Sequence, residues 1–440
     1  MSRPWTIALD AMGGDLGPRS VIVGAADVSY RYPDARFLIF GDEAKLAPLM
    51  RKVGRLKDRA EIRHTTGLVG PKDKPSHVLR RGSDTSMGRA IHAVVSGEAD
   101  GVVSNGNTGA LMALSMYLLK TLPGVDRPAI ASLMPTSRGE VIMLDLGANV
   151  ECDARNLTQF AMMGAHFAHA VLGRQKPLVG LLNVGVEETK GRDAIRQAAD
   201  ILRQNKDLPL EFHGFVEGGD INQGVVDVVV TDGFTGNVAL KTMEGTARMI
   251  GGYLRAVFRR SLLTKLSYLI AQGAIDALRQ RLDPRYYNGG VFLGLNGIVV
   301  KSHGGADSVA FASALELAID MVADDLPART ARDVGRFFGS GDGNRGDAEA
   351  STQGTQAQGT QAQGTQAQGT QAQGSQAQGT STQDAAGGGA APAAAAKSGE
   401  PGAAASGETG SANAGSTNVG AGESGDGAGE VEHRIAGQAV

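Results

Sequence analysis

The stretch LVGLLNVGVEETKG (Leu178–Gly191) joins an apolar segment to a loop of glycine and charged residues. Its first five residues are apolar or glycine, which is typical of a strand buried on both faces. The loop then carries Glu187, Glu188 and a single lysine, Lys190. In parallel sheets, ligands bind beyond the carboxyl ends of the strands. Lys190 therefore lies where such a fold would place a site.

The same arrangement recurs along the chain. Short apolar runs alternate with stretches of helical pattern, which predicts a largely parallel sheet with helices on both faces. The expected strands are 6–9, 36–40, 101–104, 129–133, 141–144, 178–182, 226–230 and 297–300. The expected helices include 84–96, 108–119, 156–172 and 308–322. The fold class is therefore α/β.

Six polar loops follow these strands. They are DAMGGD (Asp10–Asp15), SNGNTGA (Ser104–Ala110), DLGANVEC (Asp145–Cys152), NVGVEETKG (Asn183–Gly191), TDGFTGNV (Thr231–Val238) and KSHGGAD (Lys301–Asp307). One glycine-rich turn after a strand is ordinary turn chemistry. Because the strands are expected to be parallel, all six loops are expected at one edge, where they would form a binding site.

The SNGNTGA loop is the best local candidate for an anion site. Ser104, Asn105, Asn107 and Thr108 offer side-chain donors, and the loop leads into a helix whose first N–H groups favour negative charge. A helix cap alone would explain the same residues. The loop is not a Walker motif, because GxxxxGK[ST] is absent from the sequence.

Other familiar sites are not supported. A GxGxxG match at 341–346 follows no strand, and neither GxSxG nor HExxH occurs. His166 and His169 share one helix face but have no third ligand, so a packing role is favoured over a metal site. Cys152 is the only cysteine, which excludes a disulfide within the chain and a CxxC site. We expect neither a metal nor a cofactor, and no nucleic-acid partner.

The chain divides by composition into a body, residues 1–340, and a tail, residues 341–440. The tail has no aromatic residue and no leucine, and it repeats GTQAQ four times from Gly354, so we expect it to be disordered. The N-terminus lacks the apolar run of a signal peptide and no stretch is long and apolar enough to span a membrane. These features predict a cytoplasmic protein.

The segment Arg248–Leu282 has seven basic residues and one acid, with apolar residues at helical spacing. Such a stripe is usually core or a subunit interface. Its basic bias also suits an acidic protein or the anionic inner face of the cell membrane, where it would give peripheral association.

The longer motifs carry a resemblance to a known family. IALDAMGGDLGP, SNGNTGALM, LDLGAN, LLNVGVEETKG, TDGFTGNVALKTMEG and VVKSHGGAD occur in this order from about Thr6 to about Val334. They resemble the bacterial acyl-[acyl-carrier-protein]:phosphate acyltransferases of phospholipid synthesis. The tail lies outside the resemblance.

The resemblance implies a reaction and a fold. Inorganic phosphate attacks the thioester of a long-chain acyl carrier protein, and the acyl phosphate formed passes to a membrane glycerol-3-phosphate acyltransferase. The implied fold is a three-layer α/β/α body, similar to phosphotransacetylases and isocitrate dehydrogenases, which forms a homodimer. A phosphotransacetylase acting on coenzyme A thioesters, or a dehydrogenase of the related fold, is the alternative.

The reaction agrees with the residues present. Phosphate is itself the nucleophile, so no activated serine or cysteine is needed, only cations and donors for the carbonyl oxyanion. Lys190, held charged by Glu187 and Glu188, and Asn237 are the expected catalytic residues; Asn237 alone would be explained as a helix cap. The residues expected to bind substrate are Asp10, Gly13, Gly14, Ser104, Asn105, Asn107, Thr108, Asp145, Asn149, Asp232 and His303.

Overall fold

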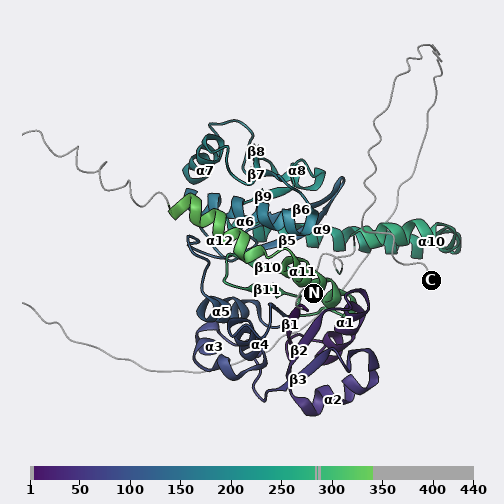
Figure 1. Cartoon of the computed structure of the whole chain (residues 1–440). Coiled ribbons are helices and arrows are strands. Elements are labelled where there is room, and N and C mark those ends of the chain that lie inside the picture. The colour runs from purple at the N-terminus through teal and green to yellow at the C-terminus, as the bar shows by residue number, and fades with distance from the viewer. Residues whose placement is uncertain (1–3, 283–284, 286–288, 340–440) are drawn as a thin grey trace, which may run out of the picture. The chain divides into compact units, whose positions relative to one another are not determined.

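The computed structural model describes residues 4–282, 285 and 289–339, and they all belong to one compact unit. The predicted tail, 341–440, lies outside the described residues. Within the described part, eleven strands form one sheet in the order β3-β2-β1-β4-β11-β10-β5-β6-β9-β7-β8 (Figure 1). The strands are β1 (Thr6–Asp10), β2 (Arg36–Gly41), β3 (Ala60–His64), β4 (Gly101–Ser104), β5 (Ala129–Thr136), β6 (Gly139–Leu144), β7 (Leu178–Leu182), β8 (Glu211–Val216), β9 (Val228–Val230), β10 (Gly290–Leu293) and β11 (Ile298–Lys301).

Helices connect most of these strands. They are α1 (Pro18–Arg31), α2 (Glu43–Lys52), α3 (Pro75–Arg81), α4 (Ser86–Val95), α5 (Thr108–Leu119), α6 (Ala154–Leu172), α7 (Asp193–Gln204), α8 (Gly218–Gln223), α9 (Gly233–Arg259), α10 (Leu262–Leu282), α11 (Ser308–Ala323) and α12 (Leu326–Gly339), with short 3₁₀ turns at Gly54–Leu56 and Gly82–Asp84. All eight predicted strands and all four predicted helices are present, with shifts of a few residues at their ends. The segment Arg248–Leu282 comprises the second half of α9 and the whole of α10.

Helices cover both faces of the sheet, as predicted. Successive residues of β1 point to opposite faces: Ile7 and Leu9 pack with α1 and α11, whereas Ala8 packs with α4 and α5. In the other half of the sheet, α6 and α7 cover the first face, and α8 with the start of α9 covers the second. This gives three layers, α/β/α, with the strands buried on both sides.

The direction of the strands differs from the prediction. Three neighbouring pairs, β11–β10, β10–β5 and β5–β6, are antiparallel, and the other seven are parallel. Consequently β1, β4 and β11 run one way, and β6, β9 and β7 run the other way. The six polar loops therefore lie at two opposite edges, and the expectation of a single edge is wrong.

One feature of the chain causes this reversal. Only Ser137 and Arg138 separate β5 from β6, and so short a connection can join strands only as an antiparallel hairpin. Strand β10, which sequence analysis missed, is antiparallel to both of its neighbours, β11 and β5, and therefore leaves these two strands running the same way. We call the two groups of carboxyl ends the β1/β4/β11 edge and the β6/β9/β7 edge.

Candidate active site

Asp145 organises the β6/β9/β7 edge. It follows β6 directly and is fully buried. Its carboxylate accepts hydrogen bonds from the backbone N–H groups of Ile130 (3.0 Å), Gly147 (3.1 Å), Ala148 (2.9 Å) and Asn149 (2.7 Å), and from Asn149 Nδ2 (2.9 Å). A buried carboxylate with five donors fixes the loop that follows β6. The role seen for Asp145 and Asn149 is thus to shape this edge.

Asp232 fixes the start of α9. Its side chain caps the helix by accepting from Thr235 N at 2.8 Å, and it also pairs with Arg192 of the loop after β7. A side chain at Gly236 would overlap the carbonyl oxygen of Asp145, since an added Cβ would lie 1.9 Å from that atom. The first turn of α9 therefore packs directly on the loop that Asp145 holds.

This packing places Asn237 in the second turn of α9. Its side chain is exposed and lies beside Gly147, whose backbone has φ 134°. The alternative that Asn237 caps the helix is wrong, because Asp232 is the cap. Asn237 is thus free of a structural role at the helix start and borders the loop after β6.

Lys190 lies in the loop after β7, which is anchored by the buried Asn183. Asn183 Nδ2 donates to the carbonyl oxygens of Gly185 (3.1 Å) and Lys190 (3.2 Å), and Gly191 turns the chain with φ 84°. The Lys190 side chain is exposed. Glu188 pairs with Arg203 at 3.4 Å, and within the described residues Lys190 has no ion pair. The expected pairing of Lys190 with its neighbouring glutamates is therefore not found.

Lys190 and Asn237 share an edge, as predicted. Strands β7 and β9 are parallel neighbours with Leu181 opposite Val230, so the loop that carries Lys190 and the helix that carries Asn237 both begin at the same end of these strands. Arg192 and Asp232 join these loops. Sequence analysis missed Arg192 and Asn183; the run TKGR, which places a second cation two residues after Lys190, was the available signal.

Cys152 lies beside the same edge, in a small pocket that Arg192 and Asp232 also line. Burial raises the pKa of the Cys152 thiol to about 12, and the nearby carboxylates Asp145 and Asp232 add to this effect. A thiol with this pKa stays protonated near neutral pH and is a poor nucleophile. The only cysteine of the chain is therefore unsuited to covalent catalysis.

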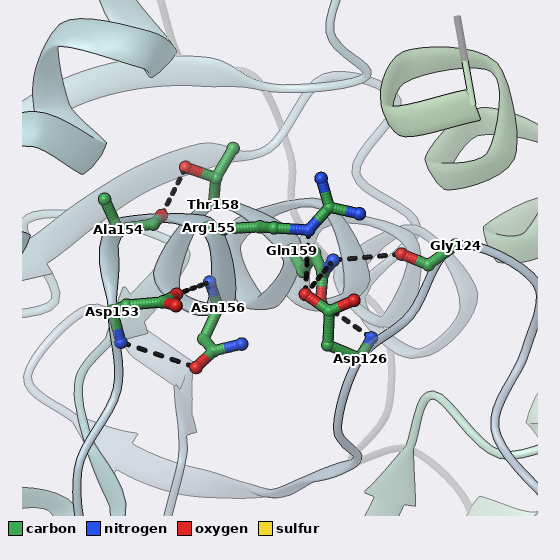
Figure 2. Close-up of polar contacts among 8 residues, drawn as sticks. All are labelled: Gly124, Asp126, Asp153, Ala154, Arg155, Asn156, Thr158 and Gln159. Carbon is green, nitrogen blue, oxygen red and sulfur yellow. Dashed lines mark hydrogen bonds and ion pairs between the residues drawn. The ribbon is translucent and has the colours of Figure 1, made fainter. Parts of the chain in front are cut away.

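The chain next to Cys152 is held by the start of α6. Figure 2 shows the capping box in which Asp153 accepts from Asn156 N (2.7 Å) and Asn156 accepts from Asp153 N (3.4 Å). Arg155 and Gln159 contact Asp126, and Gln159 also donates to the carbonyl oxygen of Gly124 at 2.9 Å (Figure 2). These bonds tie the segment before β5 to the helix that follows the β6 loop.

The opposite, β1/β4/β11 edge holds the other predicted site residues. Asp10 is buried and accepts from Ser86 Oγ (2.6 Å) and Ser104 Oγ (2.7 Å). Gly13 and Gly14 pack against the loop after β4, where an added Cβ would lie 2.7 Å from Gly106 and 2.4 Å from Asn105 Nδ2, respectively. Only glycine fits these two positions.

The remaining residues of this edge border the same loops. Asn107 caps α5 by accepting from Ala110 N at 3.0 Å, so the cap interpretation of SNGNTGA holds for this residue. Thr108 begins the helix and is exposed. His303 is exposed, and its Nδ1 accepts from Gly305 N at 3.2 Å.

Within the described residues, no group of three or more histidine, cysteine or acidic side chains is placed to hold a metal. His166 contacts Asp333 of α12 (3.2 Å), and His169 contacts Asp324, just before α12 (3.3 Å), which agrees with the predicted packing role. Burial lowers the pKa of His166 below its usual value, although Asp333 raises it.

Fold and site together define an α/β protein with two clusters of polar loops, one of which carries the exposed side chains of Lys190 and Asn237. Residues 5–329 match the family described as "Fatty acid synthesis protein". Relatives named phosphate acyltransferase are 55% identical over 340 residues in Parvibaculum lavamentivorans, covering 77% of this chain and 94% of the relative. In Paramagnetospirillum magneticum the identity is 52% over 337 residues, covering 77% and 96%. The chain therefore belongs to the fatty acid synthesis protein family of phosphate acyltransferases and is an acyltransferase.

The solved EutD phosphotransacetylase from Staphylococcus aureus has a similar fold. The TM-score is 0.50 at 18% identity, covering 72% of this chain and 94% of that one. At this identity the likeness shows the fold alone, and it confirms the predicted phosphotransacetylase-like architecture.

Proposed function

We propose that the protein transfers a long-chain acyl group from acyl carrier protein to inorganic phosphate and releases acyl phosphate for phospholipid synthesis. The family match over residues 5–329 carries this proposal. The placement of Lys190 and Asn237 just beyond the carboxyl ends of the neighbouring strands β7 and β9 supports it. The acyl phosphate would pass to a membrane glycerol-3-phosphate acyltransferase.

The step needs one bond formed and one broken. A phosphate oxygen attacks the carbonyl carbon of the thioester, and the carbonyl electrons move onto its oxygen. The intermediate collapses, the C–S bond breaks, and the carrier leaves as a thiolate that takes up a proton. The Lys190 ammonium and the Asn237 amide donate to the oxyanion, which bears more charge in the transition state than in the substrate.

No protein nucleophile is required for this step. Phosphate is anionic near neutral pH, and a thiolate with a reference pKa of about 8.5 leaves without strong acid assistance. The raised pKa of Cys152 removes the one thiol that could have formed an acyl-enzyme. Direct transfer to phosphate is therefore the simplest chemistry for this edge.

We assign Asp145, Asn149 and Asp232 a structural role at the β6/β9/β7 edge, since their side chains hold its loops in place. The other predicted substrate-binding residues belong to the β1/β4/β11 edge, on the opposite side of the sheet. They would bind a different part of a substrate or a different ligand. They are Asp10, Gly13, Gly14, Ser104, Asn105, Asn107, Thr108 and His303.

The test is acyl phosphate formation, trapped as the hydroxamate. The protein would be incubated with phosphate and one of three donors: palmitoyl carrier protein, palmitoyl coenzyme A or acetyl coenzyme A. We expect product with palmitoyl carrier protein at a kcat/KM well above that with either coenzyme A ester. A preference for acetyl coenzyme A would instead favour a phosphotransacetylase-like activity, and no product with any donor would contradict the proposal.

The helices α9 and α10 offer a surface for partners. They expose large apolar side chains, including Tyr253, Leu262 and Ile270, beside Arg259 and Arg260. Among the described residues, no helix is long and apolar enough to cross a membrane. We propose that this surface binds the anionic membrane face peripherally, where each basic residue contributes about 1 kcal/mol.

The membrane proposal has a direct test. Arg259→Glu with Arg260→Glu should reduce pelleting with anionic vesicles and leave turnover in solution largely unchanged. Unaltered pelleting would assign the apolar surface to the interface of the proposed homodimer.

A further inference from the structure

Three residues end neighbouring strands in one row. Asp10 of β1 lies opposite Ser104 of β4, and Ser104 lies opposite Lys301 of β11. Residues paired across parallel strands point to the same face, so the three side chains share one side of the sheet. Lys301 is the cation of this row, and sequence analysis did not single it out.

Asp10, the negatively charged residue of this row, already has hydrogen-bond donors. Asp10 accepts hydroxyl hydrogen bonds from Ser86 (2.6 Å) and Ser104 (2.7 Å), and Ser104 Oγ in turn accepts from Gly106 N at 3.1 Å. A buried carboxylate with two hydroxyl donors does not depend on the lysine for hydrogen bonds.

Lys301, the positively charged residue of this row, forms no ion pair with the described residues. The Lys301 side chain is half-buried, and its Nζ donates to the carbonyl oxygen of Ser302. In the part of the chain that the structure describes, no carboxylate forms an ion pair with Lys301. Burial lowers the pKa of Lys301 from 10.5 to about 8, even though Asp10 and Asp15 raise it. A half-buried ammonium that forms no ion pair with the described residues would be stabilised by an anion.

A second side chain of the same edge lacks a partner. Asn105 is completely buried, and neither its amide nitrogen nor its amide oxygen has a hydrogen-bond partner among the residues that the structure describes. The amide lies under two glycine-rich loops, because an added Cβ at Gly14 would lie 2.4 Å from Asn105 Nδ2 and 2.9 Å from the Gly304 carbonyl oxygen. Buried amides are almost always hydrogen-bonded, so this one indicates a site that is completed by a ligand.

We propose that Lys301 and Asn105 bind a phosphate-type oxyanion at the β1/β4/β11 edge, at a site separate from Lys190 and Asn237. The ammonium supplies charge, the Asn105 amide supplies N–H donors, and the glycines at 13, 14, 304 and 305 let the two loops part and admit the anion close to the backbone. The inference rests on the proposed function only for the origin of the anion. Inorganic phosphate and the phosphodiester of a pantetheine arm share the required chemistry.

The test is calorimetric titration of the full chain, without an acyl donor, using inorganic phosphate in one arm and 4′-phosphopantetheine in the other. The ligand that binds identifies the source. Lys301→Met should weaken its binding at least 10-fold, and Lys301→Arg should weaken it less than 3-fold. Lys176→Met, which removes an exposed lysine elsewhere, should bind as the wild type does.

The pH profile separates a charge role from a packing role. Wild-type affinity should fall as pH rises through about 8, where Lys301 loses its proton, and Lys301→Arg should abolish this fall because arginine stays charged. Asn105→Ala should lose affinity without loss of thermal stability, since the amide has no partner within the described part of the chain.

Two results would overturn the site: binding of neither ligand by the wild type, or wild-type binding of both by Lys301→Met. Its failure is distinguishable from failure of the proposed function. Acyl phosphate formation with normal binding by Lys301→Met would remove the site alone. Binding that depends on Lys301 without acyl phosphate formation would remove the function alone.

Discussion

The two edges of the sheet are built from the same sequence pattern but differ in how their polar groups are satisfied. At the β6/β9/β7 edge, both buried carboxylates have partners. Asp145 accepts five hydrogen bonds, and Asp232 caps helix α9 and forms an ion pair with Arg192. The Lys190 and Asn237 side chains there are exposed. At the β1/β4/β11 edge, the buried Asn105 amide has no hydrogen-bond partner among the described residues, and the half-buried Lys301 forms no ion pair with them. A rigid edge with exposed donors suits chemistry, whereas an edge with buried unsatisfied groups suits ligand binding.

The largest expected effect is on catalysis at the β6/β9/β7 edge. Asn237→Ala should lower kcat by ~10²- to 10³-fold, the usual loss for one oxyanion donor. Combined with Lys190→Ala, it should lose less than the product of the two single losses, because both residues serve one centre. Steady-state kinetics of all three variants is the measurement. Fully multiplicative losses would mean that the two residues act independently.

The next largest effect is on stability at the same edge. Asp145→Ala leaves five donors without their acceptor, two of them the buried N–H groups of Asn149, and should lower the free energy of unfolding by about 3 to 4 kcal/mol. Asp153→Ala removes only the cap of α6 and should cost about 1 kcal/mol, which makes it the matched control. Denaturant unfolding measures both. Equal losses in the two variants would show that the Asp145 loop is no more than an ordinary cap.

Sequence analysis predicted the layers but not the two edges. The apolar runs at Ile7, Val102 and Val230 are read directly from composition, because strands buried on both faces are continuously apolar. Strand direction is not encoded in that pattern. The opposite direction of the two groups follows from the two-residue β5–β6 connection.

The sequence predicted only the part of the candidate site that local motifs encode. Lys190 and Asn237 stand in long, distinctive motifs, and their common edge followed from two parallel strands. The pairing of Glu188 with Arg203 depends on where α7 packs, which no local pattern shows. Lys301 looked like one more strand-end residue until its burial and its register with Ser104 were known.

A pH experiment sharpens the contrast at the β1/β4/β11 edge. The folded chain holds Lys301 at a pKa of about 8, below its ordinary value of 10.5, so between these pH values the unfolded chain binds more protons. Stability should therefore rise with pH across this window. Lys301→Met should lack this rise, so the difference in unfolding free energy between wild type and variant should change steadily from pH 8 to 10.5. Parallel curves of unfolding free energy against pH for the wild type and Lys301→Met would mean that Lys301 is solvated like an ordinary surface lysine.

Smaller effects are expected at Cys152. With a pKa of about 12, only roughly 10⁻⁴ of this thiol is ionised at pH 8, so iodoacetamide should modify it slowly. Cys152→Ala should keep kcat within about twofold, since direct transfer uses no thiol. Mass spectrometry of the alkylated protein and a kinetic assay check the two points. Rapid alkylation with loss of activity would bring the thiol back into the mechanism.

The smallest effect is expected outside the described residues. Truncation after Ser340 should leave the melting temperature and turnover unchanged, because the removed sequence has no aromatic residue and no leucine to contribute to a core. A lower melting temperature or rate would show that the tail supports one of the two edges.

The role of Lys190 is the central claim, and the kinetics of Lys190→Ala test it most directly. Initial rates of acyl phosphate formation would be measured with palmitoyl carrier protein over a range of phosphate concentrations, with circular dichroism to verify the fold. We predict a kcat reduced by ~10²- to 10³-fold with little change in the KM for phosphate, because the ammonium acts on charge that develops only in the transition state. A folded Lys190→Ala enzyme with near-normal kcat would contradict the account and return the lysine to a solvated loop.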